Sequence, residues 1–117
     1  MTENKKKAID VAFLRSVIED DRDFERELFA IFTENAQRNL VKMDEAIKNV
    51  DSNSWYMAAH AFKGAAASIG AFELSKALEY AQRHPEDNNE EKQKVLTRIK
   101  EEFNRVLEFI NEELLEK

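Results

Sequence analysis

Apolar residues recur every three or four positions along most of the chain, and this spacing predicts a series of amphipathic α-helices. A short helix is predicted from about Asp10 to Glu19. A long helix follows the acidic stretch 20–23, whose aspartates suit a helix N-terminus. Its predicted core-facing stripe consists of Phe24, Leu28, Ile31, Phe32, Leu40, Met43, Ile47 and Val50, with Asn35 and Asn39 as polar gaps.

The second half of the chain predicts three further helices. The stretch 49–53 interrupts the pattern, and Asp51 or Ser52 can cap a helix that runs to Gly70, which we expect in a left-handed conformation. A shorter helix is predicted from about Phe72 to Arg83, with an inward face of Leu74, Ala77, Leu78 and Ala81. After a loop at 85–89, the last helix spans about Glu90 to Glu116, with a core stripe of Val95, Ile99, Phe103, Val106, Ile110 and Leu114.

The connections between these helices are short, which makes consecutive helices antiparallel neighbours. Two glycines and one proline in 117 residues also disfavour a sheet protein with many tight turns. We therefore predict an all-α fold, an antiparallel four-helix bundle with a short additional N-terminal helix. Residues 1–8 are expected to form a flexible tail, and residues 9–117 the bundle domain.

Composition narrows the classes of function. A net charge of -6 disfavours nucleic acid as the main partner. The absence of cysteine excludes a disulfide framework and a thiolate metal site, and it fits a reducing compartment. No apolar run reaches membrane-spanning length, and the first residues lead into an amphipathic segment rather than a signal-peptide core. We expect a cytoplasmic protein without a membrane partner.

The most informative stretch is 59–70. On a helical wheel His60 lies almost opposite Phe62 and Ile69, so the apolar face is the one that His60 is not on. Lys63 and Gly64 lie one turn from His60, at the spacing of helical neighbours. A solvent-facing imidazole is thus surrounded by small residues and one cation.

Sequence motifs of self-sufficient enzymes are absent. Two glycines cannot build a phosphate-binding loop or a dinucleotide fingerprint. His60 and His84 are the only histidines, and neither belongs to a paired motif for a metal on an inward face. No base lies near a serine or threonine at helical spacing except His60 itself.

His60 then has three interpretations: a surface histidine without a task, a hydrogen-bonded histidine at the bundle rim, or a nucleophile that carries a group. Gly64 in mid-helix costs about 1 kcal/mol relative to alanine, which makes sense if another molecule must approach the ring closely. Lys63 suits the oxygens of an attached phosphoryl group, although it can equally be a solvated side chain. A neutral imidazole can attack phosphorus without a dedicated base. Together these neighbours favour phosphoryl transfer.

The run His60-Ala61-Phe62-Lys63-Gly64, with Gly70 six residues beyond Gly64, resembles the signature of histidine-containing phosphotransfer (HPt) domains. The helical layout and the Leu-Ser-x-Ala-Leu-Glu run at 74–79 extend this resemblance over nearly the whole chain. It implies that His60 exchanges a phosphoryl group, through Nε2, with an aspartate of a receiver domain. It also implies that this chain has no cofactor, ATP site or metal of its own, because the receiver supplies Mg²⁺.

The resemblance assigns further roles residue by residue. Lys63 becomes the neutralising cation, Gly64 the clearance for the receiver's loops, and Gln82 the residue that orients the imidazole through its other nitrogen. Ser68 is expected to hydrogen-bond locally or to fill space. Glu86 stands where some relatives have an arginine, so a second cation would have to come from Arg83 or Lys42.

The implied partners are response-regulator receiver domains, with a sensor or hybrid histidine kinase as a further candidate. We expect a monomer that is a phosphoryl carrier in a two-component phosphorelay rather than an independent enzyme. The receiver is expected to dock on Tyr56, Met57, Ala67 and exposed parts of Phe13 or Val17, although core packing is the favoured interpretation of Phe13. Three alternatives remain: the phosphotransfer domain of a chemotaxis-type kinase, a non-catalytic helical adaptor and a metal-binding bundle.

Overall fold

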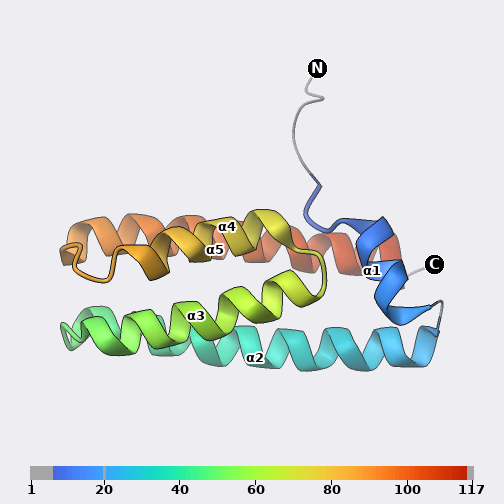
Figure 1. Ribbon diagram of the computed structural model, residues 1–117, viewed down its shortest axis with the longest axis horizontal. Helices are drawn as coiled ribbons and strands as arrows, with labels where there is room; N and C mark the ends of the chain where they lie inside the picture. The colour runs from blue at the N-terminus through green and yellow to red at the C-terminus, as the bar shows by residue number, and fades with distance from the viewer. Residues whose placement is uncertain (1–6, 20, 116–117) are drawn as a thin grey trace, which may run out of the picture.

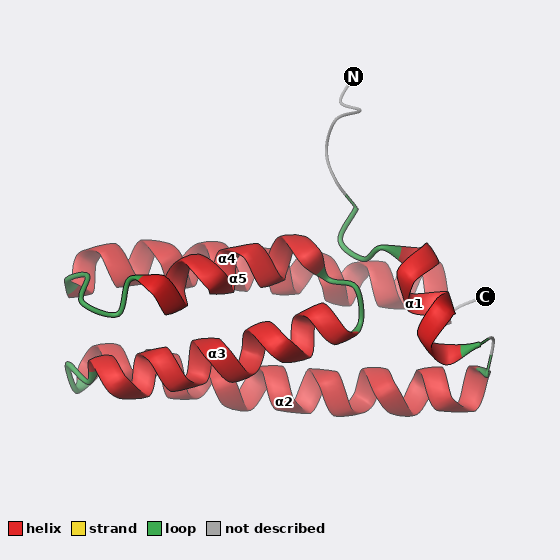
Figure 2. Ribbon diagram, in the orientation of Figure 1, coloured by secondary structure: helices red, strands yellow, loops and turns green. Residues whose placement is uncertain are grey.

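The computed structural model describes residues 7–19 and 21–115, and every regular element in this part of the chain is a helix (Figures 1 and 2). The helices are α1 (Val11–Ile18), α2 (Arg22–Lys48), α3 (Ser52–Ser68), α4 (Phe72–Arg83), α5 (Asn89–Phe109) and the π-helical segment η1 (Ile110–Leu115). In Figure 1, α2 and α3 lie below α4 and α5, and α1 lies across one end. The all-α prediction of a four-helix bundle with one extra N-terminal helix is confirmed.

The bundle closes as a ring of neighbours: α3 packs against α2 and α4, and α5 packs against α4 and α2. Aromatic side chains join these helices at the centre. The ring of Phe103 on α5 lies 6.0 Å from that of Phe32 and 6.1 Å from that of Phe62. Trp55 on α3 is almost fully buried and donates its indole N–H to the carbonyl of Ala81 on α4, at 2.9 Å. The core therefore fixes how α3 and α4 face each other.

Side-chain caps begin four of the five α-helices. Asp10, Asp21, Asp51 and Asn88 each accept a hydrogen bond from the backbone N–H three residues later, which satisfies a donor that the helix leaves unpaired. The predicted caps of α2 and α3 are thus confirmed. The fourth helix, α4, follows Ala71 and has no side-chain cap.

Two similar turns lie on either side of α3. At each, the residue after the helix cap has a positive φ, 52° for Val50 and 81° for Gly70, and two backbone hydrogen bonds close the turn. The predicted left-handed Gly70 is confirmed. Its carbonyl also accepts the backbone N–H of Asp10 at 2.9 Å, and a Cβ there would lie 3.0 Å from the Asp10 carbonyl oxygen. The α3–α4 turn is therefore tied to the start of α1.

The predicted stripe of α2 is partly wrong. Phe24, Ile31 and Val50 are exposed, and Leu28 and Leu40 are only half-buried. The buried residues of α2 are Glu25, Phe29, Phe32, Ala36, Asn39, Met43, Ala46 and Ile47. These follow the alternating four- and three-residue steps of helices packed in a bundle. The prediction missed Phe29, and it also missed the small and polar residues on the true inner face.

The ends of the chain also differ from the expectation. Helix α5 ends at Phe109 and continues as η1, and it buries Leu96 more completely than Val95. The predicted core position Leu114 lies outside the residues whose side chains are described. Most of the predicted N-terminal tail falls on residues 1–6, also outside the described part, whereas Ala8 is buried against the core. The inward face predicted for α4 is confirmed in full.

Candidate functional site

Helix α3 has one buried and one exposed face, and His60 lies on the exposed one. The buried face consists of Trp55, Ala58, Ala59, Phe62 and Ala66. Burying the large rings of Trp55 and Phe62 fixes the rotation of the helix, because turning it would expose both to water. His60 is therefore presented to solvent by the packing of its neighbours.

The surface beside His60 is open. A Cβ at Gly64 would meet no atom within 4 Å, so the space over this turn is free for another molecule. Lys63 is half-buried, and its carbonyl accepts a hydrogen bond from Ser75 Oγ on α4 at 3.5 Å. Ser68 is exposed and donates to the carbonyl of Ala65 at 2.7 Å, so the expected local hydrogen bond is present.

The imidazole of His60 has an aromatic neighbour on its own helix. The ring of Tyr56 lies parallel to it, at an interplanar angle of 3° and a centroid distance of 6.1 Å. Within the described part of the chain, neither ring nitrogen of His60 has a hydrogen-bond partner, so the interpretation as a bonded rim histidine gains no support. From the sequence, Tyr56 was predicted only as part of the docking surface. Its position four residues before His60 was the signal that could have found this contact.

Gln82 on α4 lies beside Tyr56 on α3. Its Nε2 donates to the hydroxyl oxygen of Tyr56 at 3.4 Å, and its Oε1 is buried without a partner among the described residues. The structure thus brings Gln82 to the tyrosine that stacks on His60, and it shows no hydrogen bond between Gln82 and the imidazole in the described chain.

The cations near the site differ in their availability. Arg83 forms an ion pair with Glu79 at 2.7 Å, which occupies one of the two candidates for a second cation. Lys42 lines a groove of about 510 Å³ between α2 and α3, together with Met57 and Ala61, and has no ion pair among the described residues. Glu86 is exposed in the loop after α4. Lys63 and Lys42 therefore both lack an ion pair in the described part of the chain.

Asp51, at the start of α3, has a lowered pKa, because hydrogen bonds from the backbone and the hydroxyl of Ser54 stabilise its charged form.

Among the described residues there is no group of three or more side chains suited to hold a metal ion. No described helix is both long and apolar enough to cross a membrane.

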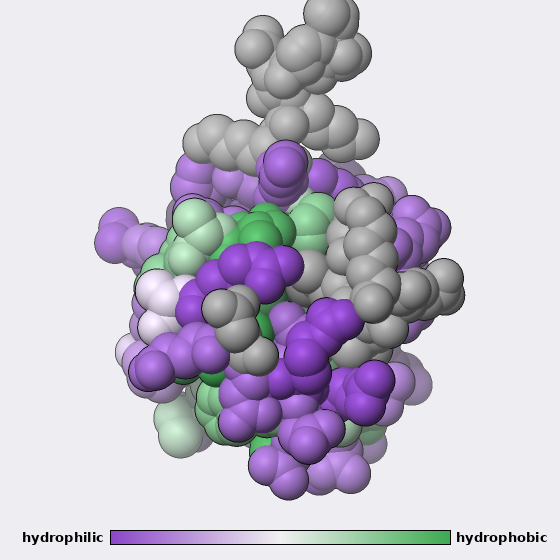
Figure 3. Space-filling model, turned by 90° about the vertical axis from the view of Figure 1, so that its right-hand side faces the viewer, coloured by the Kyte–Doolittle hydropathy of each residue, from purple (hydrophilic) through white to green (hydrophobic). Residues whose placement is uncertain are grey.

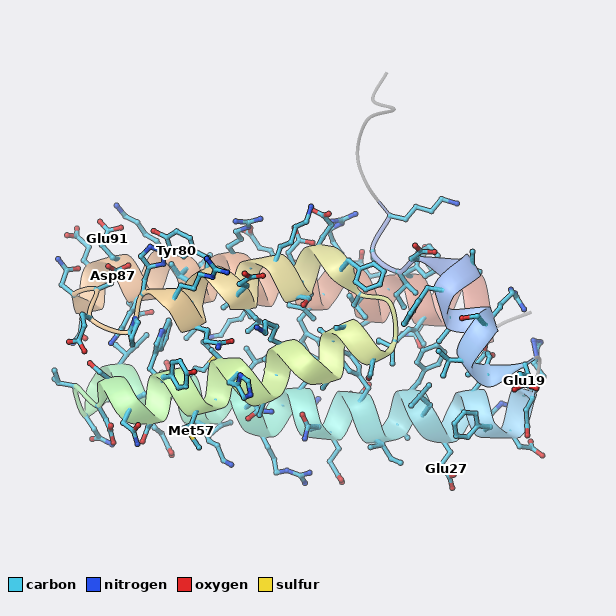
Figure 4. All side chains as sticks on the ribbon, viewed as in Figure 1. Glu19, Glu27, Met57, Tyr80, Asp87 and Glu91 are labelled. Atoms are coloured by element: carbon cyan, nitrogen blue, oxygen red, sulfur yellow. The ribbon has the colours of Figure 1, made fainter. Side chains whose placement is uncertain are left out.

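Exposed apolar side chains lie on both ends of the α3 surface. Tyr56 is 38% and Met57 58% exposed near the start of α3, where Figure 4 shows Met57 on α3 and Tyr80 on α4 in the same half of the bundle. At the other end Phe13 is 37% exposed and packs edge-on against Phe72, with ring centroids 5.3 Å apart. The favoured core assignment of Phe13 is therefore wrong. Figure 3 shows small apolar areas among hydrophilic side chains at this end of the bundle.

Comparisons with known proteins agree with this geometry. The Hpt domain family model matches residues 27–109, which include α3, α4, α5 and most of α2. A solved structure, histidine-containing phosphotransfer protein B (HptB) from Pseudomonas aeruginosa PAO1, is similar in fold with a TM-score of 0.81 at 21% identity, covering 92% of this chain and 96% of that one. A search of curated proteins found no match. Since the family model spans more than half of the sequence, the chain belongs to the Hpt domain family.

Proposed function

We propose that His60 is the phosphoacceptor of this histidine phosphotransfer module, and that it exchanges a phosphoryl group with an aspartate of a receiver domain. The observation that carries the proposal is the combination of an exposed imidazole with empty space over Gly64. A receiver must bring its aspartyl phosphate to within bonding distance of a ring nitrogen, and only an uncovered turn of helix allows that approach.

The chemistry requires little from this chain. Nε2 of a neutral imidazole attacks phosphorus, one N–P bond forms, and the P–O bond of the acyl phosphate breaks. The bonding electrons leave with the aspartate carboxylate. The ring keeps the proton on its other nitrogen and becomes positively charged, so an acceptor for that N–H stabilises the product. The buried Oε1 of Gln82, which has no partner among the described residues, is our candidate acceptor.

Cations of this chain and of the receiver together neutralise the negative charge of the phosphoryl group. Lys63 lies one turn from His60, and Lys42 lines the adjacent groove, so both ammonium groups can approach the phosphoryl oxygens. Transfer of a phosphoryl group depends mainly on in-line positioning and on neutralising charge. The receiver would supply its own Mg²⁺, so this chain acts as a carrier rather than as an independent enzyme.

The test is to incubate the protein with a phosphorylated receiver domain and to measure a phosphoryl label that is lost in acid and retained in alkali. We expect the wild-type protein to acquire the label and His60→Gln to acquire none. Binding of the receiver without any label on the wild type would contradict the proposal and favour the helical adaptor.

The phosphotransfer domain of a chemotaxis-type kinase is the second candidate, because its motif around the histidine is closely similar. The same assay separates the two, with an isolated ATP-binding kinase domain and ATP in place of the receiver. Labelling by the kinase domain alone would favour this second candidate, whereas labelling by receivers alone supports the relay.

A further inference from the structure

Tyr56 connects the imidazole of His60 to the amide of Gln82. Its ring lies parallel to the imidazole, and its hydroxyl oxygen accepts the hydrogen bond from Gln82 Nε2 at 3.4 Å. Tyr56 is partly exposed, so it forms a wall of the open surface rather than part of the core. Because of these two contacts, a substitution at Tyr56 would affect both the orientation of the His60 ring and the hydrogen bonding of the Gln82 amide.

The amide of Gln82 has a donor end and an acceptor end, and the two ends do opposite things to a histidine. With the donor end on Tyr56, the acceptor Oε1 is left buried and without a partner in the described part of the chain. A buried carbonyl oxygen favours any N–H that reaches it. If the amide rotated by half a turn, its NH₂ group would instead donate to the ring nitrogen that faces it. The proton of the neutral imidazole would then lie on the other nitrogen, which would have no lone pair for attack.

The packing of α3 and α4 places His60 one helical turn from Tyr56, the residue that contacts Gln82. The helices are antiparallel, and Gln82 faces Tyr56 while Ser75 faces Lys63. His60 lies between Tyr56 and Lys63 on α3, one turn from each. The imidazole N–H of His60 is therefore our candidate donor to Gln82 Oε1.

Resting on the proposed function and deepening it, we propose that Tyr56 is a positioning residue for His60. Its hydroxyl holds the amide of Gln82 with the oxygen directed to the imidazole, and its ring limits the orientations of the imidazole plane. The result is one preferred tautomer, with the proton on the nitrogen that faces Gln82 and a free lone pair on the nitrogen that faces solvent.

The test is ¹⁵N NMR of the histidine rings in the unphosphorylated protein, which distinguishes the two neutral tautomers. The chain has two histidines, so His84 is an internal reference in every spectrum. For Tyr56→Phe, which keeps the ring and removes the hydroxyl, we expect about a fivefold change in the tautomer ratio of His60 and none in that of His84. An unchanged ratio at His60 would overturn the proposal.

Tyr80→Phe is the matched control, because Tyr80 on α4 also stacks on a histidine four residues later, His84. We expect it to leave the tautomer ratio of His60 unaltered. If Tyr80→Phe changes that ratio as much as Tyr56→Phe does, the effect is general to the bundle and the proposed local role of Tyr56 is wrong.

A double variant tests whether Tyr56 acts through Gln82. In a Gln82→Met background, Tyr56→Phe should cause no further change in the His60 ratio, whereas additive changes would contradict a shared route. The tautomer readout needs no phosphoryl transfer, so it separates the two proposals. Normal labelling with an unaltered ratio would refute only the role of Tyr56. If Tyr56→Phe alters the ratio but the wild type accepts no label, only the relay would be refuted.

Discussion

Helices α3 and α4 each carry a tyrosine followed four residues later by a histidine, and the two histidines differ in what their ring nitrogens can do. The rings of Tyr80 and His84 lie 3.9 Å apart, and His84 Nδ1 lies 2.7 Å from the Tyr80 carbonyl oxygen. A carbonyl only accepts, so this nitrogen carries the proton. The rings of Tyr56 and His60 lie 6.1 Å apart, and no such bond is present.

Position along the helix explains the difference. His84 follows the last residue of α4, and its backbone N–H bonds the Ala81 carbonyl at 3.3 Å, which leaves the Tyr80 carbonyl open to the imidazole. In the middle of α3, the helical hydrogen bonds already use the carbonyl of Tyr56. The same tyrosine–histidine pair therefore gives a histidine whose Nδ1 is already hydrogen-bonded at a helix end. In mid-helix it gives a histidine whose ring nitrogens have no partner among the described residues. The comparison teaches that mid-helix placement keeps His60 available to a partner.

The largest expected effect comes from removing one histidine at a time. With a phosphorylated receiver, His84→Gln should retain full labelling, whereas His60→Gln loses it completely. The physical reason is that only His60 lies in mid-helix beside open surface. Site mapping of the label by mass spectrometry under alkaline conditions checks this result. A label on His84 would break the comparison between the two helices.

Filling the space beside His60 should have the next largest effect. Gly64→Leu places a branched side chain where none is present, and we expect transfer to fall by about 100-fold because the reacting groups are held apart. Rates of transfer from the phosphorylated receiver measure this effect.

Gly64→Ala is the matched control for that change. It should stabilise the protein by about 0.5–1 kcal/mol, since alanine is the better helix former at an exposed site with free space. Urea denaturation measures the stability of both variants. If Gly64→Leu unfolds the bundle, the surface around His60 is not free as we infer.

A smaller effect is expected from the cations of the two helices. Lys63→Ala on α3 should slow phosphoryl transfer by about tenfold, the value of one charge-assisted hydrogen bond. Lys76→Ala on α4 is the control, because Lys76 pairs with Glu73 at 3.5 Å, and it should change the rate by less than about twofold. Equal effects of the two variants would mean that net charge, not the position of Lys63, controls the reaction.

The smallest effect concerns the starts of the two helices. The Asp51 cap of α3 titrates, whereas α4 has no side-chain cap. Because the folded pKa of Asp51 lies below its ordinary value of 3.8, its charge stabilises the protein above that value, and the contribution is lost as pH falls through the folded pKa. Urea denaturation of wild type and Asp51→Asn should therefore show a stability difference at pH 6 that shrinks below pH 3. A constant difference would show that the charge of Asp51 contributes nothing.

The sequence predicted the helices well because their signals are local. Asp21 and Asp51 cap as expected, and Gly70 ends α3 where its missing side chain is needed. Val50 was not predicted at a positive φ, because a β-branched residue rarely adopts one, and only the closure of the α2–α3 turn places it there. Tertiary context thus decided what local preference could not.

The site was predicted only as far as one helix determines it. The solvent-facing His60 and the clearance at Gly64 follow from the period of α3. The partner of Gln82 depends on the register between α3 and α4, which the indole of Trp55 helps to fix through Ala81, and no local pattern in the sequence encodes that register. The inner face of α2 was also missed in part, because Asn39 is buried by pairing with Asn35 rather than by being apolar.

Trp55 is the protein's single tryptophan, and it lies on the same helix as His60 with its indole anchored one residue before Gln82. The ammonium group of Lys92 on α5 sits 5.3 Å from its ring centroid. Its fluorescence therefore reports on the spacing of three helices without any added dye. A partner that binds the exposed face without moving the helices should leave the Trp55 emission constant. A partner that separates α3 from α4 should shift the emission, because the indole would become exposed to solvent.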